Sequence, residues 1–449
     1  MTWTRAQRIG VPLGVLFILV CIVYWGGTAT PGWLFGLGVA VLIASMLGFG
    51  LFLYWLLFAP MKSAVIAKPN PVLRQLGAIA VLVSATQMTF ATAWDEAWHR
   101  RYGVGNDFLW MPHILIYSSF AICSLLASAG MVYLVLRGQG SLRQRARSEP
   151  LVALVAFSSL FLLFSAPSDL LWHRIYGLDI TAWSLPHITL MIGFVGLVLC
   201  GATLALSSAP NADWQGIRGI RLNEWLMLWL CGAALMFLLQ FGTTEWENIT
   251  SSRLELGLFR LTVFWQRSEW LFVAALLGLT GFIGAFAQNA TRRIGVATLV
   301  GGFLILQRTF GLLLIGGFDL GMTLRAHGLA LMALIALDSV AYWRKNGAWR
   351  WQAAVLSGAI ALTLGLIGIW QVMVYPRVNV ETIVGHVLAG GLAWLGFTYV
   401  GALLGSSVAS LTKLETVRVV WLPRLTVAAL TGVLAILVVS IISAVPPRL

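Results

Sequence analysis

The chain has 449 residues, of which 59% are hydrophobic and only 10% are charged, and its formal net charge is +13 at pH 7. Soluble domains carry charge on about a quarter of their residues, so this composition excludes an ordinary soluble protein. A membrane-spanning helix needs about 20 mainly apolar residues. Such stretches recur from Val11 to Val445 with no room for a soluble domain between them. The sequence therefore predicts an all-α, polytopic integral membrane protein with a single transmembrane domain over residues 1–449.

In chain order we predict about 13 transmembrane helices. Their ranges are 11–30, 34–59, 73–97, 112–136, 151–173, 184–207, 222–242, 268–288, 293–316, 322–343, 351–374, 381–408 and 422–444. The first range follows Arg5 and Arg8 and also has the pattern of a signal peptide. We favour an uncleaved first helix.

The basic residues predict the orientation of these helices. If successive connections alternate sides, 19 of the 29 Lys and Arg residues fall on the side of the N-terminus and nine on the other, with Arg308 inside a span. Cytoplasmic connections are enriched in Lys and Arg, so the N-terminus is predicted to be cytoplasmic and the protein to be a multi-pass protein of the cell membrane. Membrane topology then accounts for the positive charge. We expect the lipid bilayer as a partner and no nucleic acid.

Histidines and acids were not used to set this orientation. All six histidines and 11 of the 16 acidic residues nevertheless fall at the extracytoplasmic face. The polar chemistry of the chain is therefore predicted to face outward.

A motif of Asp, His and a second His occurs twice. Residues 95–114 and 169–188 align without a gap at an offset of 74 and share nine identities. The two sets are Asp95, His99 and His113, and Asp169, His173 and His187. Each unit is a helix, an outer connection and a returning helix. We therefore predict parallel repeats over 71–144 and 145–218, in which helices 3–4 correspond to helices 5–6.

The spacing suggests how each motif folds. Asp and His at i and i+4 lie on one face of a helix, and Tyr-Gly is typical of a helix end. Proline suits the first turn of the next helix, where its missing N–H costs nothing. Two histidines and a carboxylate with open positions suit copper, iron or zinc. The alternative is structural: Asp pairs with Arg, and His caps a helix end.

The same pattern resembles the copper-site motif of the C subunit of particulate methane and ammonia monooxygenases. That family has Asp-x3-His-x12-His across two membrane helices, whereas this chain has Asp-x3-His-x13-His in both copies. The resemblance covers about twenty residues in each copy. It implies copper and oxygen chemistry at the two sets of residues.

Three further polar residues lie in predicted spans. His327 and His386 are next to glycines, which leave room for a haem, and the alternative is that both are packing histidines. Arg308 lies deep in a span, where a base is costly unless it is paired or binds an anionic cofactor group. The segment 243–268 is predicted to lie along the outer membrane surface.

These features favour a metal-binding membrane protein that acts at the extracytoplasmic face. Copper is the expected metal, and a monooxygenase-like or respiratory-type redox subunit is the most concrete form. The alternatives are a transporter or copper-handling protein and a structural subunit that associates with other membrane subunits.

Overall fold

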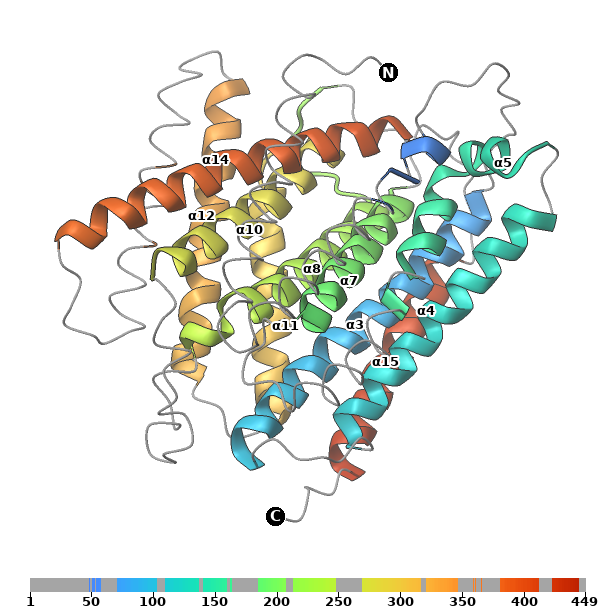
Figure 1. Ribbon diagram of the computed structural model, residues 1–449, viewed down its shortest axis with the longest axis horizontal. Coiled ribbons are helices and arrows are strands. Elements are labelled where there is room, and N and C mark those ends of the chain that lie inside the picture. Colours follow the sequence, from blue (N-terminus) through green and yellow to red (C-terminus); the bar gives the residue numbers. More distant parts are fainter. Residues whose placement is uncertain are drawn as a thin grey trace. The chain divides into compact units, whose positions relative to one another are not determined.

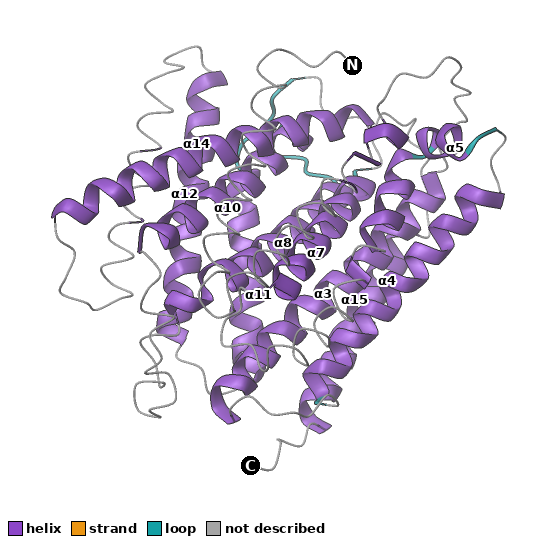
Figure 2. Cartoon of the chain, viewed as in Figure 1, coloured by secondary structure: helices purple, strands orange, loops and turns teal. Residues whose placement is uncertain are grey.

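Figure 1 shows a computed structural model of the chain. The structure describes residues 48, 51–52, 54–57, 71–102, 110–136, 140–159, 162–163, 185–206, 213–247, 269–315, 320–345, 358, 360, 365, 380–411 and 422–443. Helices account for almost all of these residues (Figure 2), and the only β-pairing among them is an isolated bridge between Gln215 and Arg293. The predicted all-α class is confirmed for this part of the chain.

The helices divide between two compact units. Unit 2 comprises Leu19–Asp95, His99–Ala209 and Leu411–Leu449, and unit 1 comprises Met1–Ile18, Glu96–Trp98 and Pro210–Ser410. The helices of unit 2 are α3 (Pro71–Tyr102), α4 (Met111–Leu136), α5 (Leu142–Ser148), α7 (Leu185–Ala205) and α15 (Leu422–Ser443). Those of unit 1 are α8 (Leu222–Glu247), α10 (Glu269–Thr291), α11 (Val296–Ile315), α12 (Leu320–Lys345) and α14 (Val380–Leu411).

Seven of the described helices are long and apolar enough to cross a membrane. They are Val72–Asp95, Met111–Gly130, Pro186–Ala205, Leu222–Thr243, Trp270–Thr291, Val384–Ser407 and Arg424–Ser443. Three shorter apolar helical stretches cover Pro150–Ser159, Val296–Gly311 and His327–Trp343. Each coincides with a predicted span. The predicted span 11–30 lies outside the described residues, and spans 34–59, 151–173 and 351–374 are described only in part.

In unit 2, α3 and α4 form an antiparallel pair joined by polar side chains. Gln87 Nε2 donates to the Leu115 carbonyl at 2.8 Å. One turn earlier in α3, Ser84 Oγ lies 3.4 Å from the Ser119 carbonyl and 3.3 Å from Cys123 Sγ. Residue numbers fall along α3 as they rise along α4, so the two helices run in opposite directions. This arrangement brings the end of α3 next to the start of α4.

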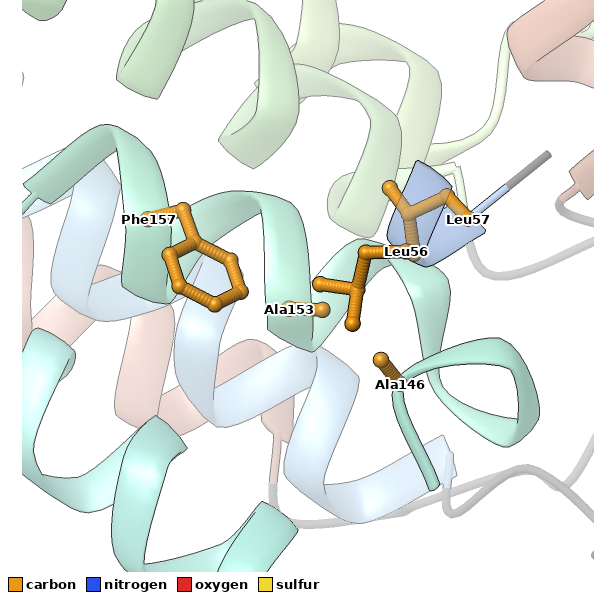
Figure 3. Close-up of a cluster of buried hydrophobic side chains, with 5 residues drawn as sticks. All are labelled: Leu56, Leu57, Ala146, Ala153 and Phe157. Carbon is orange, nitrogen blue, oxygen red and sulfur yellow. The ribbon is translucent and has the colours of Figure 1, made fainter. Parts of the chain in front are cut away.

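The short helix α5 closes a small apolar cluster in the same unit. Figure 3 shows Leu56, Leu57, Ala146, Ala153 and Phe157, all of which are buried. The helix begins with a capping box, in which Ser141 and Gln144 exchange side-chain and backbone hydrogen bonds.

Two arginines of α5 bind the helical segment 54–57, which carries Leu56 and Leu57 of this cluster. Arg143 Nε donates to the Trp55 carbonyl at 2.8 Å, and Arg147 Nε donates to the Leu56 carbonyl at 3.2 Å.

In unit 1, the turn between α10 and α11 is fixed by a carboxylate from α12. Asp338 Oδ1 accepts from Gln288 Nε2 at 2.6 Å and from the Gly295 amide at 2.8 Å. Its Oδ2 accepts from the Thr298 amide and from Thr298 Oγ1, both at 2.7 Å. Asp338 therefore caps the N-terminus of α11 from another helix, where a negative charge is favoured by the helix dipole.

A second buried acid holds the segment before α8 against the same turn. Glu224 Oε1 accepts from Arg293 Nε at 2.8 Å, and Glu224 Oε2 accepts from the Arg221 amide at 2.8 Å. The Arg293 guanidinium also donates to the Gly216 and Gly219 carbonyls at 2.9 and 3.1 Å. One ion pair thus joins three stretches of chain at this end of unit 1.

Helices α10 and α14 approach so closely that only glycine fits at their contact. A Cβ added to Gly405 would lie 2.5 Å from the Phe286 carbonyl oxygen, and one added to Gly401 would meet the Phe282 carbonyl. Small residues at such contacts are typical of helix packing in membranes. The opposite face of α14 exposes large apolar side chains, Val384, Leu388, Leu392 and Leu395, as a lipid-facing helix requires.

We expect Asp338→Asn to destabilise unit 1 strongly. The amide keeps the shape but replaces one acceptor oxygen by an NH2 group, which would face the donors either of Gln288 and Gly295 or of Thr298, and it removes the charge at the helix N-terminus. Each buried group left unsatisfied costs about 1–3 kcal/mol. Thermal unfolding of the purified protein should show a clearly lower midpoint. Asp213→Asn, at an exposed position of the same unit, is the control, and equal midpoints for the two variants would contradict this role for Asp338.

Candidate metal site at the turn between α3 and α4

The local folding predicted for the first motif is confirmed. Helix α3 continues through Asp95 and His99 to Tyr102, so Asp and His lie one turn apart on the same helix. Helix α4 begins at Met111, which makes Pro112 its second residue and His113 its third. The proline is in the first turn, where it sacrifices no helical hydrogen bond.

Asp95 and His113 come together from the two helices. His113 Nε2 lies 2.9 Å from Asp95 Oδ1, and the side chains are 19% and 22% exposed, respectively. The antiparallel pairing of α3 and α4 produces this contact, although 18 positions separate the residues in sequence. The contact brings together an imidazole nitrogen and a carboxylate oxygen, two of the three predicted ligand groups, between side chains that are partly exposed.

Two aromatic rings flank the imidazole of His113. The Trp110 ring is stacked on it, with centroids 5.8 Å apart and planes at 16°, and Trp110 is buried at 4% exposure. The Tyr117 ring lies one turn further along α4, 6.0 Å away and tilted by 41°, and is 42% exposed. Because the Trp110 carbonyl also accepts from the Ile114 amide at 2.9 Å, this residue positions the start of α4 as well as the ring of His113.

The other predicted ligands are described in part. The backbone of His99 is in α3 but its side chain is not described, and Asp169 and His173 lie outside the described residues. His187 is the third residue of α7, after Pro186, and is partly exposed. It therefore has the same position in its helix as His113. Among the side chains that the structure describes, no three His, Cys, Asp or Glu residues are grouped as metal ligands.

The three residues predicted to bind a cofactor are all buried in unit 1. Arg308 is 1% exposed in α11, His327 is 0% exposed in α12 and His386 is 3% exposed in α14. Gly284 contacts Leu334 on α12, and Gly278 contacts Phe397 on α14. The height of a residue on α12 or α14 can therefore be expressed as the number of the α10 residue at the same level. On that scale His327 and His386 are about ten residues apart, or about 15 Å along the helices. The two histidines are therefore not at one level of the unit.

Sequence analysis missed two sets of residues that the structure brings together. Trp110 precedes the predicted fourth span, and its position three residues before His113 was the available signal. The acids on the predicted cytoplasmic side were not assigned a role. Three of them, Glu149, Glu224 and Asp338, are buried and hydrogen bonded. Each has at least one partner that is distant in sequence, Arg74, Arg293 and Gln288, respectively, so spacing alone could not identify them.

The apolar helices indicate a multi-pass helical membrane protein. An Asp–His contact joins its helices α3 and α4. Comparison with known protein families, with curated proteins and with solved structures finds no match for this chain.

We expect Trp110→Ala to disturb the site much more than Tyr117→Ala. Both rings are about equally far from His113, but only Trp110 is buried, and replacing a buried aromatic residue by alanine typically costs about 3–5 kcal/mol. Thermal unfolding should show a large loss of stability for Trp110→Ala and a small one for Tyr117→Ala. Histidine NMR should show a shifted His113 signal in the first variant. Equal effects would mean that the stacking on His113 is incidental.

Proposed function

We propose that this chain is a multi-pass membrane protein that binds copper at its extracytoplasmic face and acts as a redox subunit of monooxygenase-like type. The contact of 2.9 Å between Asp95 Oδ1 and His113 Nε2 is the single observation that carries the proposal. It supports the convergence of a carboxylate and an imidazole that the motif implies. His99, one turn after Asp95 on α3, would complete the ligand set.

The spacing of the two donor atoms suits a shared ion. Metal–ligand bonds to His nitrogen and carboxylate oxygen are about 2.0–2.2 Å long. Two donors separated by 2.9 Å then subtend about 90° at the ion. That angle is found between neighbouring ligands in the tetragonal geometry of Cu(II). A direct ion pair between the two side chains is the competing explanation, and metal analysis separates the two.

The direction of the helices supports the predicted thirteen spans. Gln288 and Gly284 on α10 contact Asp338 and Leu334 on α12, so residue numbers rise together and α12 runs parallel to α10.

Helix α14 also runs parallel to α10. Gly278 and Gly405 contact Phe397 and Phe286, respectively, and these contacts again rise together along the two helices. Two successive described helices with the same direction require an odd number of crossings between them. The predicted span 351–374 supplies one crossing.

Contacts in unit 2 support the proposed repeat. Ser84 and Ser158 are 74 residues apart, and each meets a cysteine of the next long helix, Cys123 at 3.3 Å and Cys200 at 4.0 Å. The cysteines are 77 residues apart, so the two contacts correspond to within one helical turn.

A second pair of contacts is related by the same offset. Gly77 of α3 faces Leu204 of α7, while Gly130 of α4 faces Ala156 and the Val152 carbonyl. Exchanging the two repeats adds 74 to Gly77, which gives Leu151, and subtracts 74 from Leu204, which gives Gly130. The expected contact between Leu151 and Gly130 is next to the observed one between Val152 and Gly130. This exchange is what a pseudo-twofold axis between parallel repeats produces.

If each motif binds its own ion, the purified protein should contain two copper ions, and His113→Ala should leave one. Loss of both ions in this variant would indicate a composite site. Copper content by mass spectrometry and electron paramagnetic resonance measures the outcome. Copper affinity should fall as the pH is lowered, because only neutral histidine is a ligand.

The control for this experiment is Tyr117→Ala, which changes a neighbour of His113 that has no ligand atom in the predicted set. Thermal unfolding of His113→Ala and of Tyr117→Ala separates loss of the metal from loss of the fold. Absence of bound copper, iron and zinc in the folded wild type would return the Asp95–His113 contact to a purely structural role.

The proposed orientation is tested by cysteine labelling. Single cysteines introduced in 103–109 should react with a membrane-impermeant maleimide added from outside. Cysteines in 137–139, in the predicted cytoplasmic connection, should react only after the membrane is permeabilised. The reverse pattern would place the Asp–His motifs in the cytoplasm and refute an extracytoplasmic metal site.

A further inference from the structure

The contacts between α11 and α12 show how the two helices are aligned. Thr298 Oγ1 of α11 donates to Asp338 of α12 at 2.7 Å, and one turn further along Gly301 packs against Leu331 and Leu334, with Leu331 the nearer. The two helices are therefore antiparallel, with Thr298 opposite Asp338 and Gly301 opposite the turn from Leu331 to Leu334.

The same register leads to Arg308 and His327. Arg308 is seven residues after Gly301, and His327 is seven residues before Leu334. Seven residues are close to two helical turns, so each residue returns to the face that carries the contact. Both are almost completely buried, at 1% and 0% exposure. This register places Arg308 and His327 within about one turn of each other on facing sides of the two helices, about 10 Å along the helices from the close contact at Gly301.

We propose that Arg308 and His327 form a binding site for an anionic oxygen group, a phosphate or a lipid phosphodiester, within the helical bundle of unit 1. An arginine keeps its charge at any physiological pH, and its guanidinium binds phosphate and carboxylate groups through paired hydrogen bonds. Ionisable residues within membrane spans are costly and typically functional.

One neighbouring contact positions Arg308. Gln307, the residue before it, donates to the Trp229 carbonyl of α8 at 3.1 Å, which fixes this turn of α11 against a second helix. The site shares no residue with the proposed copper site.

Thermal unfolding of the full-length protein in lipid nanodiscs tests the proposal. In phosphatidylcholine discs, titration with inorganic phosphate at constant ionic strength probes a free anion. Discs that also contain phosphatidylglycerol, without phosphate, probe a lipid headgroup. A rise in the unfolding midpoint in either arm supports the site and identifies the source of the anion.

Arg308→Gln should lower the affinity for the anion, measured from the rise in unfolding midpoint, by at least about tenfold, since it removes a charged hydrogen-bond donor. Arg308→Lys keeps the charge without the planar fork and should retain weaker binding, which keeps the test informative if the Gln variant fails to fold. Arg424→Gln, at an exposed position of α15, should behave as the wild type.

The intramolecular alternative is an ion pair between Arg308 and Glu269, the first residue of α10, or Asp319, just before α12. Wild-type protein that responds to neither anion would overturn the proposal. So would a response that is unchanged in Arg308→Gln. If Glu269→Gln or Asp319→Asn restores the stability of Arg308→Gln while neither anion has any effect, Arg308 serves an internal ion pair.

Discussion

A polar group inside a bilayer has no water to bond, so it must find its partner within the protein. This constraint explains the helices, whose backbone groups pair within each segment, and it also explains the hydroxyl groups they carry. Thr89, Thr203 and Thr291 each donate to the carbonyl four residues earlier, at 2.6–2.8 Å. Such residues satisfy themselves on their own helix and impose no position on a neighbour. The residues that do fix neighbouring helices are those whose partners lie elsewhere in the chain, such as Gln87 and Asp338.

The hydrophobic effect does little to hold one apolar helix against another in lipid, so contact must come from close packing and polar links. In unit 1 the two kinds of contact alternate along α10. Gly281 and Gly284 allow α14 and α12 to approach, and Gln288, one turn further, bonds Asp338. Close packing determines which faces meet, while the hydrogen bonds determine the register along the axes. Close packing of the same kind occurs between α3 and α7, where Gly77 and Gly201 meet the larger side chains Leu204 and Val81.

The sequence predicts the existence and type of the long helices well, because a run of apolar residues of bilayer length has few alternatives. It predicts the local shape of the first motif for a similar reason: the proline of Pro112 and the i, i+4 spacing of Asp95 and His99 depend only on near neighbours. The contact of Trp110 with His113 is local, and the spacing of three residues between them was its signal in the sequence. The capping of α11 by Asp338 could not be predicted, because it depends on the rotation of one helix about its axis relative to another, and small residues and buried links set that rotation. The short helix α5 was also missed, because seven residues rich in arginine carry no apolar periodicity.

The ion pairs of this protein differ in how deeply they are buried, and the depth of burial decides whether a pair only holds helices together or can also take up another partner. Arg74 and Glu149 form a pair at 3.1 Å with both side chains 3% exposed, and Arg293 and Glu224 are equally enclosed. Breaking such a pair leaves a buried charge without compensation, so these pairs are permanent parts of the fold. The Asp95–His113 pair is roughly one-fifth exposed on each side. The Asp95 Oδ1 atom itself is enclosed, but each side chain keeps some contact with solvent, so the carboxylate loses less when the imidazole turns toward another partner. A metal ion needs ligands that are positioned by the fold, and this contact holds two such groups, one from each of two helices.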